Sequence, residues 1–277
     1  MSDRRGLSRI PLKHALTIAA SDSGAGAGIQ ADLKTFAAHR VYGLCVMSAV
    51  TAQNTTAVTA MECLSPELVT AQLAAVFDDI PVEAVKIGLL GNAANARAVY
   101  DFLARIEAGP PVVLDPVMVS ASGHAFLGLE ATEALKALIS LAALVTPNIP
   151  EAEALSGLTI NGPRAMEEAA ARLIELGPES VMIKGGHGSG ESSDDLLFHK
   201  SGQSQWLRGP RLATKNNHGT GCTLSSAIAA NLALGLDLTT AATLAKRYVT
   251  AAMENSLNLG HGPGPLNHFH EYYNFSS

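Results

Sequence analysis

Near the N-terminus, the apolar stretch Ala15-Leu16-Thr17-Ile18-Ala19-Ala20 stands just before the glycine-rich turn Ser23-Gly24-Ala25-Gly26-Ala27-Gly28. A short apolar run that ends at turn residues predicts a buried strand. We expect a helix over residues 29–40 next, and then a second strand over residues 44–52. This order of strand, turn, helix and strand is the unit from which parallel sheets are built.

The same alternation continues along the chain. Ser65-Pro66-Glu67 predicts a helix start, because it combines a capping serine, a proline suited to the first helical position and an acid suited to the first turn. Further strands are expected over residues 84–90, 112–114, 143–145 and 180–183, separated by helices over 93–106, 130–141 and 163–176. The pattern predicts an α/β fold with a mostly parallel central sheet and helices on both faces.

The C-terminal third departs from this alternation. Residues 195–212 hold two short apolar runs around Lys200-Ser201-Gly202, which predicts a small β-hairpin insertion. Helices over residues 222–234 and 239–258 are expected to close the chain. Since no repeat or linker stands out, we expect a mobile leader at residues 1–13 and a single domain over residues 14–277.

The composition narrows the class of protein. The chain has 277 residues, of which 47% are hydrophobic, and a formal charge of −6, so general attraction to nucleic acid or to an anionic membrane is not expected. Its three cysteines include no CxxC pair, which argues against a disulfide framework or a structural zinc site. No apolar run is long enough for a signal-peptide core or a membrane span, which predicts a cytoplasmic protein.

Polar side chains follow one predicted strand after another. They are Asp22, Gln53, Asp115, Asn148 with Glu151, and Lys184. Each residue by itself is more often a turn former or a helix cap. Because ligands bind beyond the carboxyl ends of parallel strands, their recurrence predicts that these side chains converge on one site.

The strongest local signal is Asn217-His218-Gly219-Thr220-Gly221-Cys222, which directly precedes an apolar helix. Two glycines allow several backbone N–H groups to point at one spot, and a helix start adds unpaired donors and the positive end of the dipole. The loop therefore predicts an anion hole suited to a transferring phosphoryl group. A tight turn before a buried helix is the plainer alternative.

Cys222 stands at this helix start, where the dipole is expected to lower the pKa of a thiol. It is a candidate base toward a substrate hydroxyl or a candidate nucleophile, and an inert core cysteine is the alternative. His218 is a possible partner, although a histidine in a glycine turn is usually structural. A cysteine hydrolase would also need an orienting third group, which the sequence does not identify.

Two nucleotide-binding motifs are incomplete. Gly26-x-Gly28-x-x-Ala31 follows a strand, but residues 47–54 lack the acid that a nicotinamide-dependent oxidoreductase needs for the ribose. Residues 185–192 lack the Lys-Ser or Lys-Thr of a Walker motif. The first glycine loop instead favours a neutral substrate pocket, in which Asp32 is positioned to accept a hydrogen bond from a hydroxyl.

A magnesium site is indicated by Asp115 and Asn148-x-x-Glu151, because they offer the oxygen ligands that Mg²⁺ prefers, usually through water. Lys184 is placed to offset phosphate charge. Glu151 equally fits the role of an acid that stabilises the first turn of the next helix.

Taken together, these motifs resemble those of a known family. The matching stretches are residues 16–19, 27–36, 51–55, 86–88, 113–118, 146–152, 184–187 and 217–225. On them the chain resembles the ribokinase-like superfamily and, within it, the hydroxymethylpyrimidine and phosphomethylpyrimidine kinases of thiamine biosynthesis, over residues 15–269. The resemblance implies ATP and Mg²⁺ as cosubstrates, a small hydroxymethylpyrimidine or its monophosphate as acceptor, and a homodimer.

The resemblance also implies roles for individual residues. At the pyrimidine it places Ala27, Asp32, Gln53, Leu89 and Val117, with Asp32 facing the hydroxymethyl oxygen. In the anion hole it places Gly219, Thr220, Gly221 and Cys222, with Cys222 as the base. At the metal and the nucleotide it places Asp115, Glu151, Asn148, Lys184, Thr214 and Lys246, with Lys184 also acting at the phosphoryl group.

The chain departs from the family at Ala20 and Ala25, where glycines are common, and at Leu89, where a methionine is frequent. The change at Leu89 alters the shape of the expected pocket. Pyridoxal-type kinases share much of the pattern, so a pyridoxal or pyridoxine kinase is the alternative function.

Overall fold

A nine-stranded sheet forms the centre of the computed structural model, which describes residues 12–117, 129–187 and 192–273. The strand order is β3-β2-β1-β4-β5-β6-β7-β8-β9. Strands β1, β2, β4, β5, β6 and β7 are parallel, whereas β3, β8 and β9 pair antiparallel at the two edges. The strands are β1 (His14–Asp22), β2 (Tyr42–Gln53), β3 (Val58–Cys63), β4 (Ala84–Ile87), β5 (Val112–Leu114), β6 (Leu144–Val145), β7 (Ser180–Ile183), β8 (Asp195–His199) and β9 (Ser204–Leu207).

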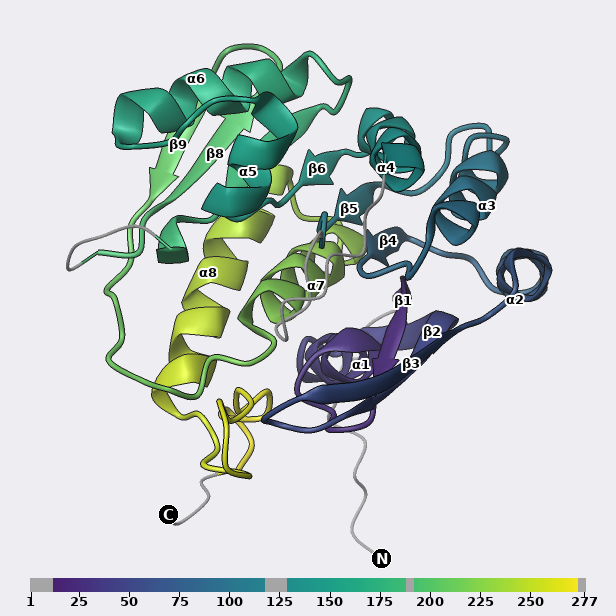
Figure 1. The fold of residues 1–277 in the computed structure, drawn as a ribbon, viewed down its shortest axis with the longest axis horizontal. Helices are drawn as coiled ribbons and strands as arrows, with labels where there is room; N and C mark the ends of the chain where they lie inside the picture. Colours follow the sequence, from purple (N-terminus) through teal and green to yellow (C-terminus); the bar gives the residue numbers. More distant parts are fainter. Residues whose placement is uncertain (1–11, 118–128, 188–191, 274–277) are drawn as a thin grey trace, which may run out of the picture.

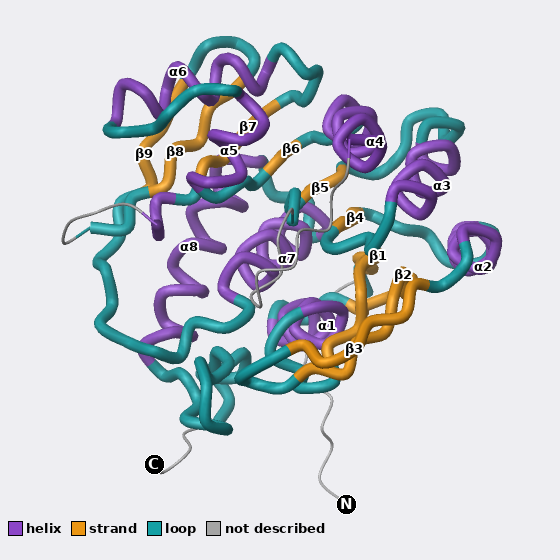
Figure 2. Tube along the Cα trace, viewed as in Figure 1, coloured by secondary structure: helices purple, strands orange, loops and turns teal. Residues whose placement is uncertain are grey.

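Helices cover both faces of this sheet (Figure 1). They are α1 (Gly28–Ala38), α2 (Pro66–Phe77), α3 (Ala93–Leu103), α4 (Leu129–Ser140), α5 (Ile149–Ser156), α6 (Pro163–Ile174), α7 (Thr220–Ala233) and α8 (Leu238–Glu254). Figure 2 shows the strands as a band that runs through the molecule between these helices. The predicted fold class is therefore confirmed.

Neighbouring residues of each central strand enter different cores, as a sheet buried on both faces requires. Ala15 of β1 and Ala84 of β4 belong to the core under α1, α7 and α8. Leu16 and Val85, the next residues along, belong to the core under α2, α3 and α4. A third core joins α5 and α6 to β7 and β8, with Met166 buried in it. This packing explains the near-continuous apolar runs of the central strands.

Several local predictions are confirmed. Ser65 caps α2 by accepting a hydrogen bond from the backbone N–H of Leu68, and Pro66 is the first helical residue. The predicted hairpin is β8 and β9, which extend the sheet at one edge.

Other element predictions are wrong. The sequence pattern does not reveal β3, which begins after Asn54 reverses the chain by accepting hydrogen bonds from the N–H groups of Thr56 and Ala57. Nor does it reveal α5, whose eight residues are too few to show a helical period. The last helix ends at Glu254 and not at residue 258, because Asn255 already leaves helical geometry. The predicted mobile leader falls mainly on residues 1–11, outside the described residues.

No helix in the described ranges is long and apolar enough to cross a membrane.

Candidate active site

A cavity of about 660 Å³ opens along the carboxyl ends of the parallel strands. Asp22 and Gln53 end β1 and β2, while Asp115, Asn148 and Lys184 follow β5, β6 and β7. The predicted site residues that line the cavity are Ala27, Gln53, Leu89, Asp115, Val117, Asn148, Glu151, Lys184, Thr214, Gly219, Thr220, Gly221, Cys222 and Lys246. The structure thus brings together the side chains that the strand-end rule predicted to converge.

The start of α7 borders two sides of this cavity, the Gln53 side, where His218 lies 3.4 Å from Gln53, and the Lys184 side, where Gly221 approaches the Lys184 ammonium. Gly219 takes a φ of +82° and approaches Gly26 so closely that a Cβ there would lie 1.9 Å from the Gly26 carbonyl oxygen. Only glycine fits this backbone. No side chain caps α7, although the N–H of Thr220 donates to the Asn217 carbonyl at 3.3 Å. The next N–H groups, those of Gly221 and Cys222, and the positive end of the dipole are therefore available to an anion in the cavity.

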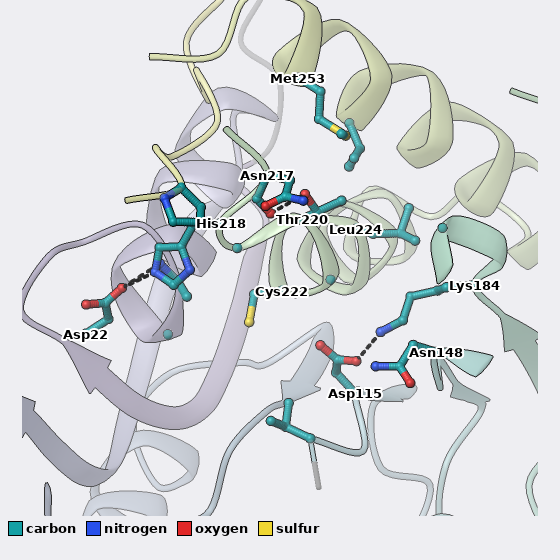
Figure 3. A pocket seen from close by; sticks show the side chains of 18 of the residues that line it. Asp22, Asp115, Asn148, Lys184, Asn217, His218, Thr220, Cys222, Leu224 and Met253 are labelled. Carbon is teal, nitrogen blue, oxygen red and sulfur yellow. Dashed lines mark hydrogen bonds and ion pairs between the residues drawn. The ribbon is translucent and has the colours of Figure 1, made fainter. Parts of the chain in front are cut away.

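Cys222 lies between the Asp22–His218 pair and the Asp115–Lys184 pair (Figure 3). Burial raises the pKa of its thiol to about 11, against the opposing charge of Lys86, and the Asp32 and Asp115 carboxylates add to the increase. The prediction that the helix start lowers this pKa is therefore wrong, because desolvation of the sulfur outweighs the favourable charges around it.

A buried ion pair forms the wall on the Lys184 side. Lys184 Nζ lies 2.7 Å from Asp115 Oδ1. Burial by itself lowers the pKa of Lys184, but the Asp115 and Glu151 carboxylates outweigh it and raise the pKa above its usual range, so the ammonium stays charged. A Cβ on Gly221 would lie 3.2 Å from Lys184 Nζ. The lysine is thus a fixed positive charge beside the first turn of α7.

Asp115 and Glu151, the two predicted metal ligands, both line the cavity and offer the oxygen atoms that Mg²⁺ prefers. Asn148 and Glu151 form a capping box at α5, with two 2.8 Å hydrogen bonds between each side chain and the other's backbone N–H. Among the described residues, no group of three or more His, Cys, Asp or Glu side chains is arranged to hold a metal ion alone. Glu151 thus takes the role of a first-turn acid, the alternative that the sequence left open, and Asp115 pairs with Lys184.

The far wall of the cavity carries Thr214, Lys246 and Arg211. Lys246 Nζ donates to Asp195 Oδ2 at 2.7 Å and to the Ser193 carbonyl, so Asp195 balances its charge. Arg211, which sequence analysis missed, donates to the carbonyl oxygens of Gly186 and Ser192 at 2.7 and 3.1 Å. No strand-end position or glycine motif marks Arg211 in the sequence.

His218 pairs with Asp22, and sequence analysis missed this contact. Its Nε2 lies 3.0 Å from Asp22 Oδ2, and Asp22 also accepts hydrogen bonds from the N–H groups of Gly24, Gly26 and Ala27. In the part of the chain that the structure describes, no hydrogen bond joins His218 to Cys222. The cysteine hydrolase hypothesis thus lacks the histidine contact that would activate its nucleophile.

Asp32 is not at the cavity wall. It is fully buried, and it accepts hydrogen bonds from Thr17 Oγ1 and Ser226 Oγ at 2.6 Å and from Lys86 Nζ at 2.9 and 2.8 Å. Burial by itself lowers the pKa of Lys86, but Asp32 together with the neighbouring Cys222 and Asp115 outweighs it and raises that pKa above its usual range. The prediction that Asp32 faces a substrate hydroxyl is wrong, because α1 directs this carboxylate into the core as the partner of a buried ammonium.

The family model described as phosphomethylpyrimidine kinase matches residues 22–267. The chain belongs to the phosphomethylpyrimidine kinase family. The matched range contains both glycine loops and every strand-end residue of the cavity. The predicted resemblance is confirmed, and so is the prediction that the chain is a kinase.

Individual proteins similar to this chain are also kinases. A hydroxymethylpyrimidine/phosphomethylpyrimidine kinase from Rhizobium meliloti (strain 1021) is 48% identical over 263 residues, which cover 94% of this chain and 98% of that protein. The crystal structure of phosphomethylpyrimidine kinase from Clostridium difficile 630 has 44% identity and a TM-score of 0.77, covering 87% of this chain and 99% of the other. The crystal structure of an ADP complex of Bacillus subtilis pyridoxal kinase has 35% identity and a TM-score of 0.88, and the match covers 95% of this chain and 100% of the other.

The structural role of Asp32 predicts how two substitutions differ. Asp32→Ala leaves Lys86 buried without its carboxylate, so the free energy of unfolding should fall by about 3–5 kcal/mol in urea titrations. Gln53→Ala, at the cavity wall, should change it by about 0.5 kcal/mol or less and should instead weaken pyrimidine binding in calorimetry. An Asp32→Ala protein with unchanged stability and selectively weakened pyrimidine binding would contradict this assignment.

Proposed function

We propose that this chain uses ATP to phosphorylate 4-amino-5-hydroxymethyl-2-methylpyrimidine and then its monophosphate, as in thiamine biosynthesis. The observation that carries the proposal is the arrangement of the cavity. In Figure 3 the start of α7 stands between the Asp22–His218 pair on one side and the Asp115–Lys184 pair on the other. Ala27 donates to Asp22, and Gln53 lies 3.4 Å from His218, so both belong to the first side. Two substrates that enter from these sides would meet at the first turn of α7. The name of the Rhizobium meliloti relative, which includes both the hydroxymethylpyrimidine and the phosphomethylpyrimidine, supports these two acceptors.

The acceptor binds on the Gln53 side. Gln53 faces its ring nitrogen and amino edge, and Ala27, Leu89 and Val117 supply a largely apolar wall. This orientation directs the hydroxymethyl oxygen toward Cys222. When the acceptor is the monophosphate, one of its phosphate oxygens takes the same place.

Transfer takes place at the first turn of α7. The acceptor oxygen attacks the γ-phosphorus of ATP, and the bond from the γ-phosphorus to the bridging oxygen of ADP breaks. When the acceptor is the hydroxymethyl group, its proton moves to the Cys222 thiolate; an ionised phosphate oxygen attacks without giving up a proton. The N–H groups of Gly219–Cys222 and the Lys184 ammonium stabilise the charge that spreads over the γ-phosphoryl oxygens.

The nucleotide lies along the opposite wall. Asn148 and Lys184 face its phosphates, and Thr214 and Lys246 border the rest of the molecule. Asp115 and Glu151 would hold Mg²⁺, which neutralises phosphate charge when bound. The family resemblance supports a homodimer, a prediction that light scattering can test. The composition supports a cytoplasmic location and a single domain over residues 14–277, and both stay predictions.

The acceptor is tested by incubating the purified chain with ATP, Mg²⁺ and the hydroxymethylpyrimidine. We expect mass spectrometry to show the monophosphate first and the diphosphate later, with ADP formed in proportion. Matched incubations without acceptor correct for ATP hydrolysis. The absence of either phosphorylated product between pH 6 and 10 would refute the proposal.

Pyridoxal or pyridoxine is the second candidate acceptor, and the likeness to the pyridoxal kinase fold favours testing it. Parallel assays with these alcohols compare kcat/KM directly. We expect the pyrimidine to have the higher value, and a higher value for pyridoxal would reassign the acceptor site.

The role of Cys222 predicts a loss of rate and a pH profile. Cys222→Ala should lower kcat by about 10² to 10⁴ and change KM little, as expected when a general base is lost. Because burial raises the pKa of the Cys222 thiol to about 11, the thiolate fraction grows with pH. Wild-type kcat/KM should therefore rise about tenfold per pH unit from roughly pH 7 to 10, while the variant should lose this dependence. Near-wild-type turnover of Cys222→Ala, or a flat wild-type profile, would show that Cys222 is not the base.

A further inference from the structure

Asp22 and His218 join two loops that are distant in sequence and meet on the Gln53 side of the cavity. Asp22 ends β1 and organises the first glycine loop by accepting hydrogen bonds from Gly24, Gly26 and Ala27 at 2.8, 3.1 and 2.9 Å. The same carboxylate reaches across to His218 Nε2 at 3.0 Å. The Asp22 side chain is 3% exposed and that of His218 15% exposed, so solvent has little access to this contact.

The backbone of the two loops interlocks around this contact. A Cβ on Gly26 would lie 2.2 Å from His218 Cδ2, and a Cβ on Gly219 would lie 1.9 Å from the Gly26 carbonyl oxygen. The C-terminal segment also contacts His218, because the backbone N–H of His218 donates to the carbonyl of Gly264 at 3.2 Å. The loop that begins α7 is thus clamped between the first glycine loop and the C-terminal segment.

The proton on the His218 ring can be assigned from its partner. Burial by itself raises the pKa of Asp22, but the hydrogen bonds from His218, Ala27 and Gly24 outweigh it and lower the pKa below its usual value, so the carboxylate is ionised and only accepts. His218 Nε2 therefore carries a hydrogen and donates it. The 3.4 Å contact between His218 Nε2 and Gln53 Nε2 then joins two donors, and Gln53 keeps its amide N–H groups for a ligand.

We propose that His218, held by Asp22, is a positioning residue that fixes the anion-hole loop relative to the acceptor side of the cavity. The inference rests on the proposed function, since it assigns the two loops to the two ends of one phosphoryl transfer. His218 touches the rim of the site, and its effect on the rate passes through the N–H groups of Gly219–Cys222. A displacement of about 1 Å between reacting groups costs on the order of 10² in rate.

Three variants test the proposal. His218→Phe keeps a ring but removes the donor, and it should lower kcat by about 10- to 100-fold while the pyrimidine KM changes by about threefold or less. His218→Gln places an amide N–H near the position of Nε2 and should restore most of kcat. His199→Phe is the matched control, because His199 bonds Ser180 at 3.0 Å on β8, outside the cavity; it should leave kcat unchanged.

A second measurement is independent of turnover. Amide hydrogen exchange across residues 217–222 should be faster in His218→Phe than in wild type or His199→Phe, with protection of α8 unchanged. Equal kcat and equal exchange in His218→Phe and wild type would overturn the proposal, as would failure of His218→Gln to restore kcat. If wild type does not phosphorylate the pyrimidine, the proposed function fails, and the exchange measurement still decides whether His218 positions the loop.

Discussion

The buried ion pair between Lys86 and Asp32 is the contact on which the arrangement of the cavity depends. Lys86 belongs to β4 and Asp32 to α1, and the same carboxylate binds Thr17 on β1 and Ser226 on α7. A charge without partners at this depth would be strongly destabilising, so four elements must assemble together. Cys222 lies one helical turn before Ser226. The contact that satisfies Asp32 therefore also fixes the start of α7 beneath the cavity.

The buried or half-buried lysines around the cavity are likewise neutralised by carboxylates. Lys86, Lys184 and Lys246 each pair with a carboxylate, namely Asp32, Asp115 and Asp195. These three lysines therefore add no net charge, in a chain whose formal charge is already −6. In the proposed reaction, binding of the ATP polyanion would draw on the N–H groups at the start of α7, on the dipole behind them and on a metal ion. This explains why the start of α7, and not a cluster of basic residues, is the strongest functional signal in the sequence.

Much of the site follows from topology, and topology can be recognised in the sequence. Gln53, Asp115, Asn148 and Lys184 were found because parallel strands end at the same edge. The roles of other residues depend on properties that the sequence does not display. Asp32 follows the first glycine loop, a position that favours a pocket residue, and only the packing of α1 shows that it is buried. The pKa of Cys222 depends on its desolvation, and the Asp22–His218 contact joins residues 196 positions apart.

The central claim is that one cavity places an acceptor and a transferable phosphoryl group on either side of the first turn of α7. A crystal structure with a non-hydrolysable ATP analogue and the hydroxymethylpyrimidine tests it most directly. The account predicts γ-phosphate oxygens within about 3 Å of the N–H groups of Gly219–Cys222, with the hydroxymethyl oxygen between them and Cys222 Sγ and the ring against Gln53. A γ-phosphate bound away from α7, or a pyrimidine bound outside the Gln53 side, would contradict it.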